Sequence, residues 1–195
     1  MPRPRRCCGR CAVGERYLVF VWDSGESSVA PSSLPDGYRS TLWRPSWRRL
    51  VPPGDSEPSL YVWWLMHHLR GFRNKSYAAL VVYSRGDVTH RSLVFPPSFV
   101  FPFMRPDDLQ IGLVSTAPSH RRHGLAVFAI RDVLRRLGRP GRRFWYLTEE
   151  SNEASVRAAT AAEFLVGGTA FKHHRLGFRR LGSFELLSEG VARDR

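Results

Sequence analysis

The residues best suited to chemistry gather in one strand–turn–helix segment, residues 108–126. Apolar residues over 109–115 predict a strand, a basic turn follows over 118–124, and helical spacing begins at Leu125. The first turn of a helix carries unpaired N–H groups and partial positive charge. Gly124 lets the backbone approach a ligand closely, and Arg121 and Arg122 add charge. The segment therefore predicts a binding site for a phosphate or pyrophosphate.

The turn has neither the G-x-x-x-x-G-K-[S/T] pattern of nucleotide triphosphate loops nor the dinucleotide fingerprint G-x-G-x-x-G. Residues 121–126 read R-R-H-G-L-A, which resembles the R/Q-x-x-G-x-G/A signature of the GNAT acyltransferase superfamily. Val114, Thr116 and Pro118 resemble the strand leading into that signature. The resemblance covers about residues 106–182 and implies the GNAT fold.

A second part of the resemblance begins at Asn152, after an apolar strand over 144–148. Many family members have Asn there, a small residue three positions on, and Phe twelve positions on. Here these are Asn152, Ser155 and Phe164. Two positions depart from the pattern: Ala159 replaces a frequent tyrosine that protonates the departing thiolate, and Glu163 replaces the usual glycine.

The resemblance implies that acyl-CoA binds across the ends of the 109–115 and 144–148 strands and that an amine attacks its thioester directly. Acetyl-CoA or another acyl-CoA is the implied co-substrate, with no metal. Backbone groups of Val114 and Thr116 would pair with pantetheine, and the pyrophosphate would lie on the 121–126 turn. Asn152 and Ser155 would touch the pantetheine arm. The implied binding residues are Val114, Thr116, Arg121, Arg122, His123, Gly124, Leu125, Ala126, Asn152 and Ser155.

This chemistry needs positioning, a base for the ammonium proton and a proton donor. Glu149, next to Glu150, is a candidate base, or a solvated loop end. Tyr146 is a candidate donor in place of Ala159, or a core aromatic. His90 could reach a central cleft, or be a half-buried histidine with its hydrogen bonds satisfied. Asp107 and Asp108 are candidates to bind an amino sugar, or are turn residues before a strand. His120 is a candidate contact for the anion rather than a catalyst. Sugar stacking, or packing in the core or a lid, is expected of Trp43, Trp47, Trp63 and Trp64.

The elements predicted along the chain form one α/β domain. Strands are expected at 17–22, 38–43, 78–83, 88–95, 109–115, 144–148, 165–170 and 181–187, with a hairpin joining 78–83 to 88–95. Helices are expected at 60–69, 125–137 and 152–164. The resemblance implies a mixed, mostly antiparallel sheet with splayed parallel central strands and helices on both faces. Residues 17–105 would form the substrate side and 106–182 the acyl-CoA core, within a single GNAT-like domain over 17–195.

Net charge is the strongest compositional feature: 30 Lys and Arg against 17 Asp and Glu give +13. Residues 120–143 hold eight arginines against one aspartate, and we expect the six beyond Arg122 to be solvated surface. The location favours a phosphorylated ligand over a nucleic acid duplex. Hydrophobic residues make up 43% of the chain, which excludes a disordered protein.

The first sixteen residues read as a poorly ordered basic tail that holds Cys7, Cys8 and Cys11. A single C-x-x-C without a second pair predicts no zinc site, and the absence of later cysteines fits a reducing cytoplasm. No apolar run of about 18 residues exists, so no membrane span is expected.

The leading hypothesis is a cytoplasmic, bacterial GNAT-type N-acyltransferase acting on a small-molecule primary amine. A weaker resemblance of residues 88–92 and 103–112 to bacterial members linked to cell-surface polysaccharides points to an amino sugar or nucleotide sugar. The alternative is a catalytically impaired binding module for acyl-CoA or an anionic partner, motivated by Ala159. Nucleic-acid binding is a third, weaker hypothesis, and a homodimer stays open.

Overall fold

A computed structural model describes residues 15–25, 29, 31–175 and 178–189, without the side chains of 174–181, 188 and 189. The three cysteines and most of the predicted basic tail lie outside these residues. The elements in chain order are β1 Glu15–Asp23, β2 Tyr38–Trp43, α1 Ser59–His68, β3 Ala78–Ser84, β4 Asp87–Phe95, β5 Leu109–Thr116, the 3-10 turn η1 Pro118–His120, α2 Leu125–Leu137, β6 Arg143–Glu149, α3 Glu153–Ala161, β7 Leu165–Arg175 and β8 Phe178–Glu189.

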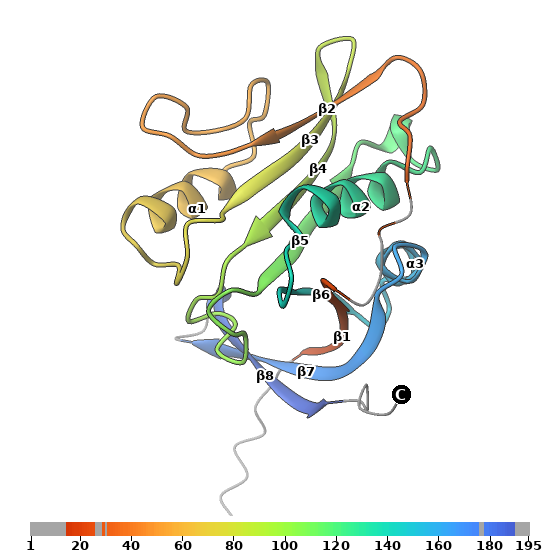
Figure 1. The fold of residues 1–195 in the computed structure, drawn as a ribbon. Coiled ribbons are helices and arrows are strands. Elements are labelled where there is room, and N and C mark those ends of the chain that lie inside the picture. Colours follow the sequence, from red (N-terminus) through yellow and green to blue (C-terminus); the bar gives the residue numbers. More distant parts are fainter. Residues whose placement is uncertain (1–14, 26–28, 30, 176–177, 190–195) are drawn as a thin grey trace, which may run out of the picture.

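The eight strands form one sheet in the order β2-β3-β4-β5-β6-β1-β7-β8 (Figure 1). Every neighbouring pair is antiparallel except β5 and β6, which are parallel. The predicted fold class, a mixed and mostly antiparallel sheet with a parallel central pair, is confirmed. The hairpin of β3 and β4 is also confirmed.

Helices cover both faces of the sheet, as expected. On one face, α2 and α3 bury apolar side chains such as Ile130 and Leu134 against Leu80, Ile111 and Phe144. The other face packs under α1 and the 96–106 segment, in a cluster that includes Leu60, Tyr77, Leu93, Phe101 and Trp145. The sheet is thus packed on both faces by separate apolar cores.

The helix predicted over 152–164 ends earlier than expected, at Ala161. The turn after it places Glu163 at φ 68°, a left-handed conformation that glycine adopts most easily. The N–H of Phe164 still reaches back to the carbonyl of Ala159, and the Glu163 carboxylate pairs with Arg131 at 3.2 Å. Glutamate therefore keeps the turn where the family pattern has glycine.

The N-terminal strand β1 lies inside the sheet, between β6 and β7. It pairs with the full length of β6, from Tyr17 opposite Glu149 to Asp23 opposite Arg143. It begins at Glu15, two residues before the expected start, and joins the 106–182 part of the fold rather than the rest of 17–105. Residues at the start of the chain thus build the strand that flanks the parallel pair.

No helix among the described residues combines the length and the apolarity needed to cross a bilayer.

Replacing Phe20 tests the structural role of β1. Phe20 is buried in the core opposite Tyr146, so Phe20→Ala should lower the free energy of unfolding in urea by about 3–5 kcal/mol. Phe99→Ala is the matched control, since Phe99 is 49% exposed and should cost far less. Equal losses for the two variants would contradict a central β1.

Candidate functional site

The two parallel strands at the centre of the sheet pair over only three positions. Leu109, Gln110 and Ile111 of β5 lie opposite Phe144, Trp145 and Tyr146 of β6, and the pairing then stops although both strands continue. Beyond this point β5 stays with β4 and β6 stays with β1. The strands therefore part, as the splayed pair of the predicted fold requires.

A β-bulge in β5 sits where the strands part. Ser92 of β4 faces two residues of β5, Leu113 and Val114, because Leu93 pairs with Gly112 and Arg91 with Ser115. Leu113 has φ 48° and its side chain is half exposed. A bulge takes backbone groups out of the ladder and redirects them, so polar backbone groups become accessible at the opening.

A cavity of about 240 Å³ fills this opening between β5 and β6. Five of the predicted site residues line it: Val114, Tyr146, Glu149, Asn152 and Ser155. The others in the lining are Tyr17, Gly112, Leu113, Leu147 and Thr148. The sequence did not single out Tyr17, because only the pairing of β1 with β6 brings it here.

The basic turn and the start of α2 follow directly from β5. Gly124 precedes the first residue of α2 with φ 72°, and no side chain of the described residues caps the N–H groups of the first turn. A Cβ added at Gly124 would meet no atom of the described part of the chain within 4 Å, so the space over the turn is open there. Arg121 and Arg122 are exposed there, and Arg122 is also left-handed at φ 65°. Open N–H groups beside two arginines suit an anion.

The side chains of Leu125 and Ala126 contribute packing rather than ligand contacts. Leu125 is 2% exposed, and Ala126 packs against the core beneath α2. Any contribution of these two predicted site residues to ligand binding would come from their backbone N–H groups.

Tyr38 of β2 holds the turn from the far edge of the sheet. Its hydroxyl lies 2.7 Å from Nδ1 of His120 and 2.8 Å from Nδ1 of His123. A hydroxyl donates one proton, so it donates to one imidazole and accepts an N–H from the other. Both rings also lie edge-on to Tyr38. His120 and His123 are thus fixed on the turn by a residue that sequence spacing could not link to it.

Asn152 and Ser155 open α3 at the wall of the cavity. The Asn152 side chain accepts a hydrogen bond from the Ser155 N–H at 3.1 Å, which makes Asn152 the N-cap of the helix. Burial raises the pKa of Tyr146, while the neighbouring Ser155 side chain acts in the opposite direction. Tyr146 is thus held as a protonated phenol beside the cavity.

Carboxylates gather at the mouth of the cavity. Glu149 is exposed at the end of β6 and also lines an adjoining open hollow with Glu15, Arg16, Glu150 and Ser151. The Tyr17 hydroxyl donates to Glu15 at 3.0 Å and lies 3.4 Å from Glu149. Burial and these two carboxylates raise the pKa of Tyr17. The mouth therefore presents negative charge on a strongly basic protein.

His90 lies apart from the cavity. It is 1% exposed, with Nδ1 2.7 Å from the Thr116 hydroxyl and Nε2 2.8 Å from the Ser92 hydroxyl. Burial, with a smaller effect of Arg91, lowers its pKa to about 4. The imidazole links β4 to β5 through Thr116 with both nitrogens engaged, and its lowered pKa favours the neutral form at neutral pH.

The paired aspartates before β5 hold its start in place. Asp108 is fully buried and accepts hydrogen bonds from the Trp145 indole at 2.9 Å and from the N–H of Arg105 at 3.0 Å. Asp107 forms an ion pair with Arg139. Both aspartates therefore have structural roles at the start of β5, away from the bulge.

The expectation that six arginines after the turn are solvated surface holds for Arg135, Arg136 and Arg139, which are exposed. It is wrong for Arg142, which is buried, while Arg131 and Arg143 are half-buried. All six bond to a carboxylate or a backbone carbonyl, because the fold brings acceptors within reach of the guanidinium forks. Arg131 pairs with Glu163, Arg135 and Arg136 with the buried Asp132, Arg139 with Asp107, and Arg143 with Asp23, while Arg142 donates to the carbonyls of Leu137 and Asp107.

No group of three or more His, Cys, Asp or Glu in the described part of the chain is arranged to hold a metal ion.

The neutral state of His90 predicts a pH dependence of stability. Its pKa is lower in the folded chain than in the unfolded chain, so the stabilising effect is complete above the unfolded value and is lost as the pH falls toward the folded one. As the pH falls from about 7 to about 5, the free energy of unfolding should decrease by about 2 kcal/mol because of His90. In His90→Gln this part of the pH slope should disappear in urea titrations. An unchanged slope would contradict the neutral, buried imidazole.

Comparison with known proteins supports the fold. No family model matches the chain, and no curated protein is similar in sequence. Among solved structures, a tandem GNAT protein from the clavulanic acid biosynthesis pathway superposes with a TM-score of 0.54 at 15% identity, over 79% of this chain and 51% of its own. An acetyltransferase of the GNAT family from Colwellia psychrerythraea gives 0.54 at 14% identity, over 80% and 54%.

A GCN5-related N-acetyltransferase from Sphaerobacter thermophilus gives a TM-score of 0.53 at 14% identity, over 81% of this chain and 50% of its own. The chain thus spans about half the length of these proteins. Identities this low relate backbones rather than activities. The fold of this chain is that of the GNAT acetyltransferases.

Proposed function

We propose that this protein is an N-acyltransferase that moves an acetyl or similar acyl group from acyl-CoA to a primary amine. The observation that carries the proposal is the cavity between the parted ends of β5 and β6, next to the open N-terminus of α2. One end of this site offers anion-binding groups and the other end offers carboxylates. An acyl-CoA has a pyrophosphate at one end and a reactive thioester at the other.

The residues of the site fit such a ligand. Backbone groups of Gly112, Leu113 and Val114 line the cavity at the bulge and would pair with a pantetheine amide. Arg121, Arg122 and the first N–H groups of α2 would hold the pyrophosphate, because the space above Gly124 is open. Ser155 and Asn152 form the opposite wall.

The chemistry divides between two side chains of the cavity. Acyl-CoA supplies a carbonyl carbon that an amine nitrogen can attack, forming an amide bond as the carbon–sulfur bond breaks. Glu149 would accept the proton of the incoming ammonium group at the cavity mouth. Tyr146 would donate a proton to the departing sulfur, since its raised pKa keeps it protonated at neutral pH.

The acceptor fits a positively charged amine, because Glu15, Glu149 and Glu150 lie at the mouth of the cavity. An amino sugar or nucleotide sugar of bacterial polysaccharide synthesis is the finer proposal, supported by the resemblance of residues 88–92 and 103–112. Use of acyl-CoA would place the activity in the cytoplasm.

A second candidate function is a binding module that senses acyl-CoA without transfer. It is favoured by Ala159, which is fully buried where the family pattern has a tyrosine. Binding of acetyl-CoA without transfer to any of a panel of amines would support it over the enzyme.

Gly124→Glu tests the anion site. The new carboxylate would occupy the open space over the turn and repel a pyrophosphate, so the affinity for acetyl-CoA in isothermal titration should fall by roughly tenfold or more. Gly141→Glu is the matched control, because Gly141 is also left-handed, at φ 79°, with nothing within 4 Å of an added Cβ. No binding by folded wild-type protein at millimolar acetyl-CoA would refute the proposal.

Tyr146→Phe tests the proton donor. With acyl transfer assayed on an accepted amine, kcat should fall by about a hundredfold while KM for acetyl-CoA changes little. Tyr77→Phe removes another buried hydroxyl, on the opposite face of the sheet, and should leave kcat unchanged. An unchanged kcat in Tyr146→Phe would exclude the phenol as the acid.

A further inference from the structure

Helix α1 carries an exposed apolar stripe that nothing in the described structure covers. Its members are Tyr61, Val62 and Leu65 in the helix and Leu69, the C-cap residue directly after it, between 48% and 71% exposed. At 100° per residue these four positions lie within a single sector about 100° wide. The opposite side of the helix is already packed, with Leu60 fully buried against the sheet. We refer to these four side chains as the α1 stripe.

Trp47 extends the α1 stripe along the flank of the helix. Its indole packs against Trp64 at 5.3 Å and His68 at 4.1 Å between ring centroids, yet 73% of Trp47 remains exposed. The Trp64 indole N–H donates to the carbonyl of Ser46 at 3.0 Å, which fixes the turn that presents Trp47. A large aromatic ring is therefore held in place and left in solvent.

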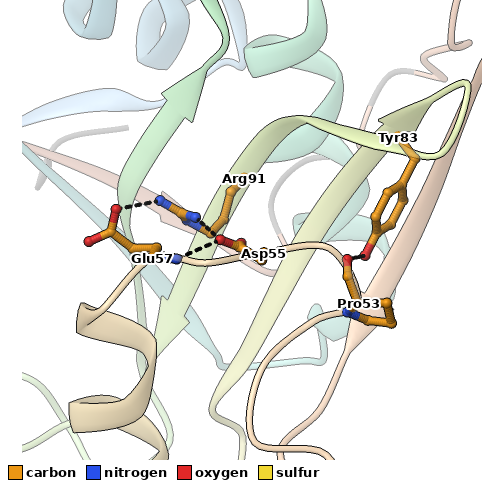
Figure 2. Close-up of polar contacts among 5 residues, drawn as sticks. All are labelled: Pro53, Asp55, Glu57, Tyr83 and Arg91. Atoms are coloured by element: carbon orange, nitrogen blue, oxygen red, sulfur yellow. Dashed lines mark hydrogen bonds and ion pairs between the residues drawn. The ribbon is translucent and has the colours of Figure 1, made fainter.

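Exposed basic side chains precede and follow α1 in the chain. Residues 44–75 contain only two acidic residues, Asp55 and Glu57, and both bind Arg91 of β4 (Figure 2). The same segment is tied down by the Tyr83 hydroxyl, which donates to the carbonyl of Pro53 at 3.1 Å. Within the described residues, none of the six basic side chains of this segment has an ion pair: Arg44, Arg48, Arg49, Arg70, Arg73 and Lys75.

We infer that the α1 stripe and Trp47 dock on an anionic lipid surface. Aromatic rings bind at the boundary between headgroups and acyl chains, and aliphatic side chains gain most by leaving water for hydrocarbon. The unpaired arginines and lysine match a layer of phosphates, each adding attraction near the surface. Apolar groups on a helix, with cations on the segments directly before and after it, are the combination that such a surface requires.

Charge and side-chain type favour lipid over two other occupants. A second copy of this chain in a two-fold interface would bring the same cations face to face. Nucleic acid would use the cations and aromatic rings but leave Val62, Leu65 and Leu69 in water, because phosphates and base edges offer them no apolar surface. A bilayer surface accommodates all three kinds of side chain.

The docking surface is separate from the proposed active site. In Figure 1, α1 lies beside β3, toward the β2 edge of the sheet, whereas the cavity lies between β5 and β6. Variants of the α1 stripe should therefore leave acetyl-CoA binding unchanged, and the inference stands or fails independently of the acyltransferase proposal.

Flotation of the full chain with lipid vesicles tests the inference. Vesicles of phosphatidylcholine with about one third phosphatidylglycerol should bind the protein, and pure phosphatidylcholine should bind it weakly. Leu65→Glu should reduce binding to the anionic vesicles by roughly tenfold. Leu187→Glu on β8 is the matched control, since Leu187 is 53% exposed against 49% for Leu65. This comparison also cancels any contribution of the basic residues 1–14.

A second double variant and its matched control test the contribution of the cations to lipid binding. Arg48→Gln/Arg49→Gln should weaken binding to anionic vesicles by roughly 25-fold, at about fivefold for each arginine. Arg85→Gln/Arg105→Gln removes two other exposed arginines and should have a much smaller effect. Equal losses for the variants and their controls would overturn the inference. So would a stripe-dependent dimer in solution, or stripe-dependent binding to duplex DNA, in a protein that ignores anionic vesicles.

Discussion

The site depends on one constraint, the early end of the pairing between β5 and β6. Each strand is held on its outer side by a longer antiparallel ladder: β4 follows β5 through the bulge to Thr116, and β1 follows β6 to Glu149. The two ladders draw the parallel strands apart after Ile111 and Tyr146. A sheet that parts exposes backbone groups that hydrogen-bonded neighbours would otherwise use, which creates a binding surface within a closed core.

The excess positive charge divides into a structural part and a free part. Most arginines after the turn neutralise carboxylates or bond to carbonyls, as Arg142 does at the end of α2, so their positive charge is used to join elements. Arg121 and Arg122 stay exposed at the open helix terminus, and Arg48, Arg49 and Arg70 stay exposed around α1. The arginines that remain exposed mark two surfaces: the turn at the start of α2 and the segments on either side of α1.

Local pattern in the sequence predicted most of the elements, and it placed α2 at its observed bounds because a strong apolar stripe ends at Gly138 and Pro140. It could not predict the neighbours of β1, since a buried strand reads the same wherever it pairs. Tyr17 and Tyr38 were missed for this reason: each enters the site through a strand far away in the sequence. The sequence also could not predict that glutamate is accommodated in the left-handed conformation at position 163, because its ion pair with Arg131 is a tertiary contact.

Ala159 and Tyr146 are best understood together. Ser155, one helical turn before Ala159 on the same face of α3, lines the cavity together with Tyr146 of β6, and Tyr146 packs edge-on against Phe164. Ala159 is fully buried in the same close-packed core as Tyr146 and Phe164. A tyrosine at position 159 would therefore need space that this core already fills. The wall of the cavity nevertheless carries a phenol, because Tyr146 lines it together with Asn152 and Ser155 at the start of α3.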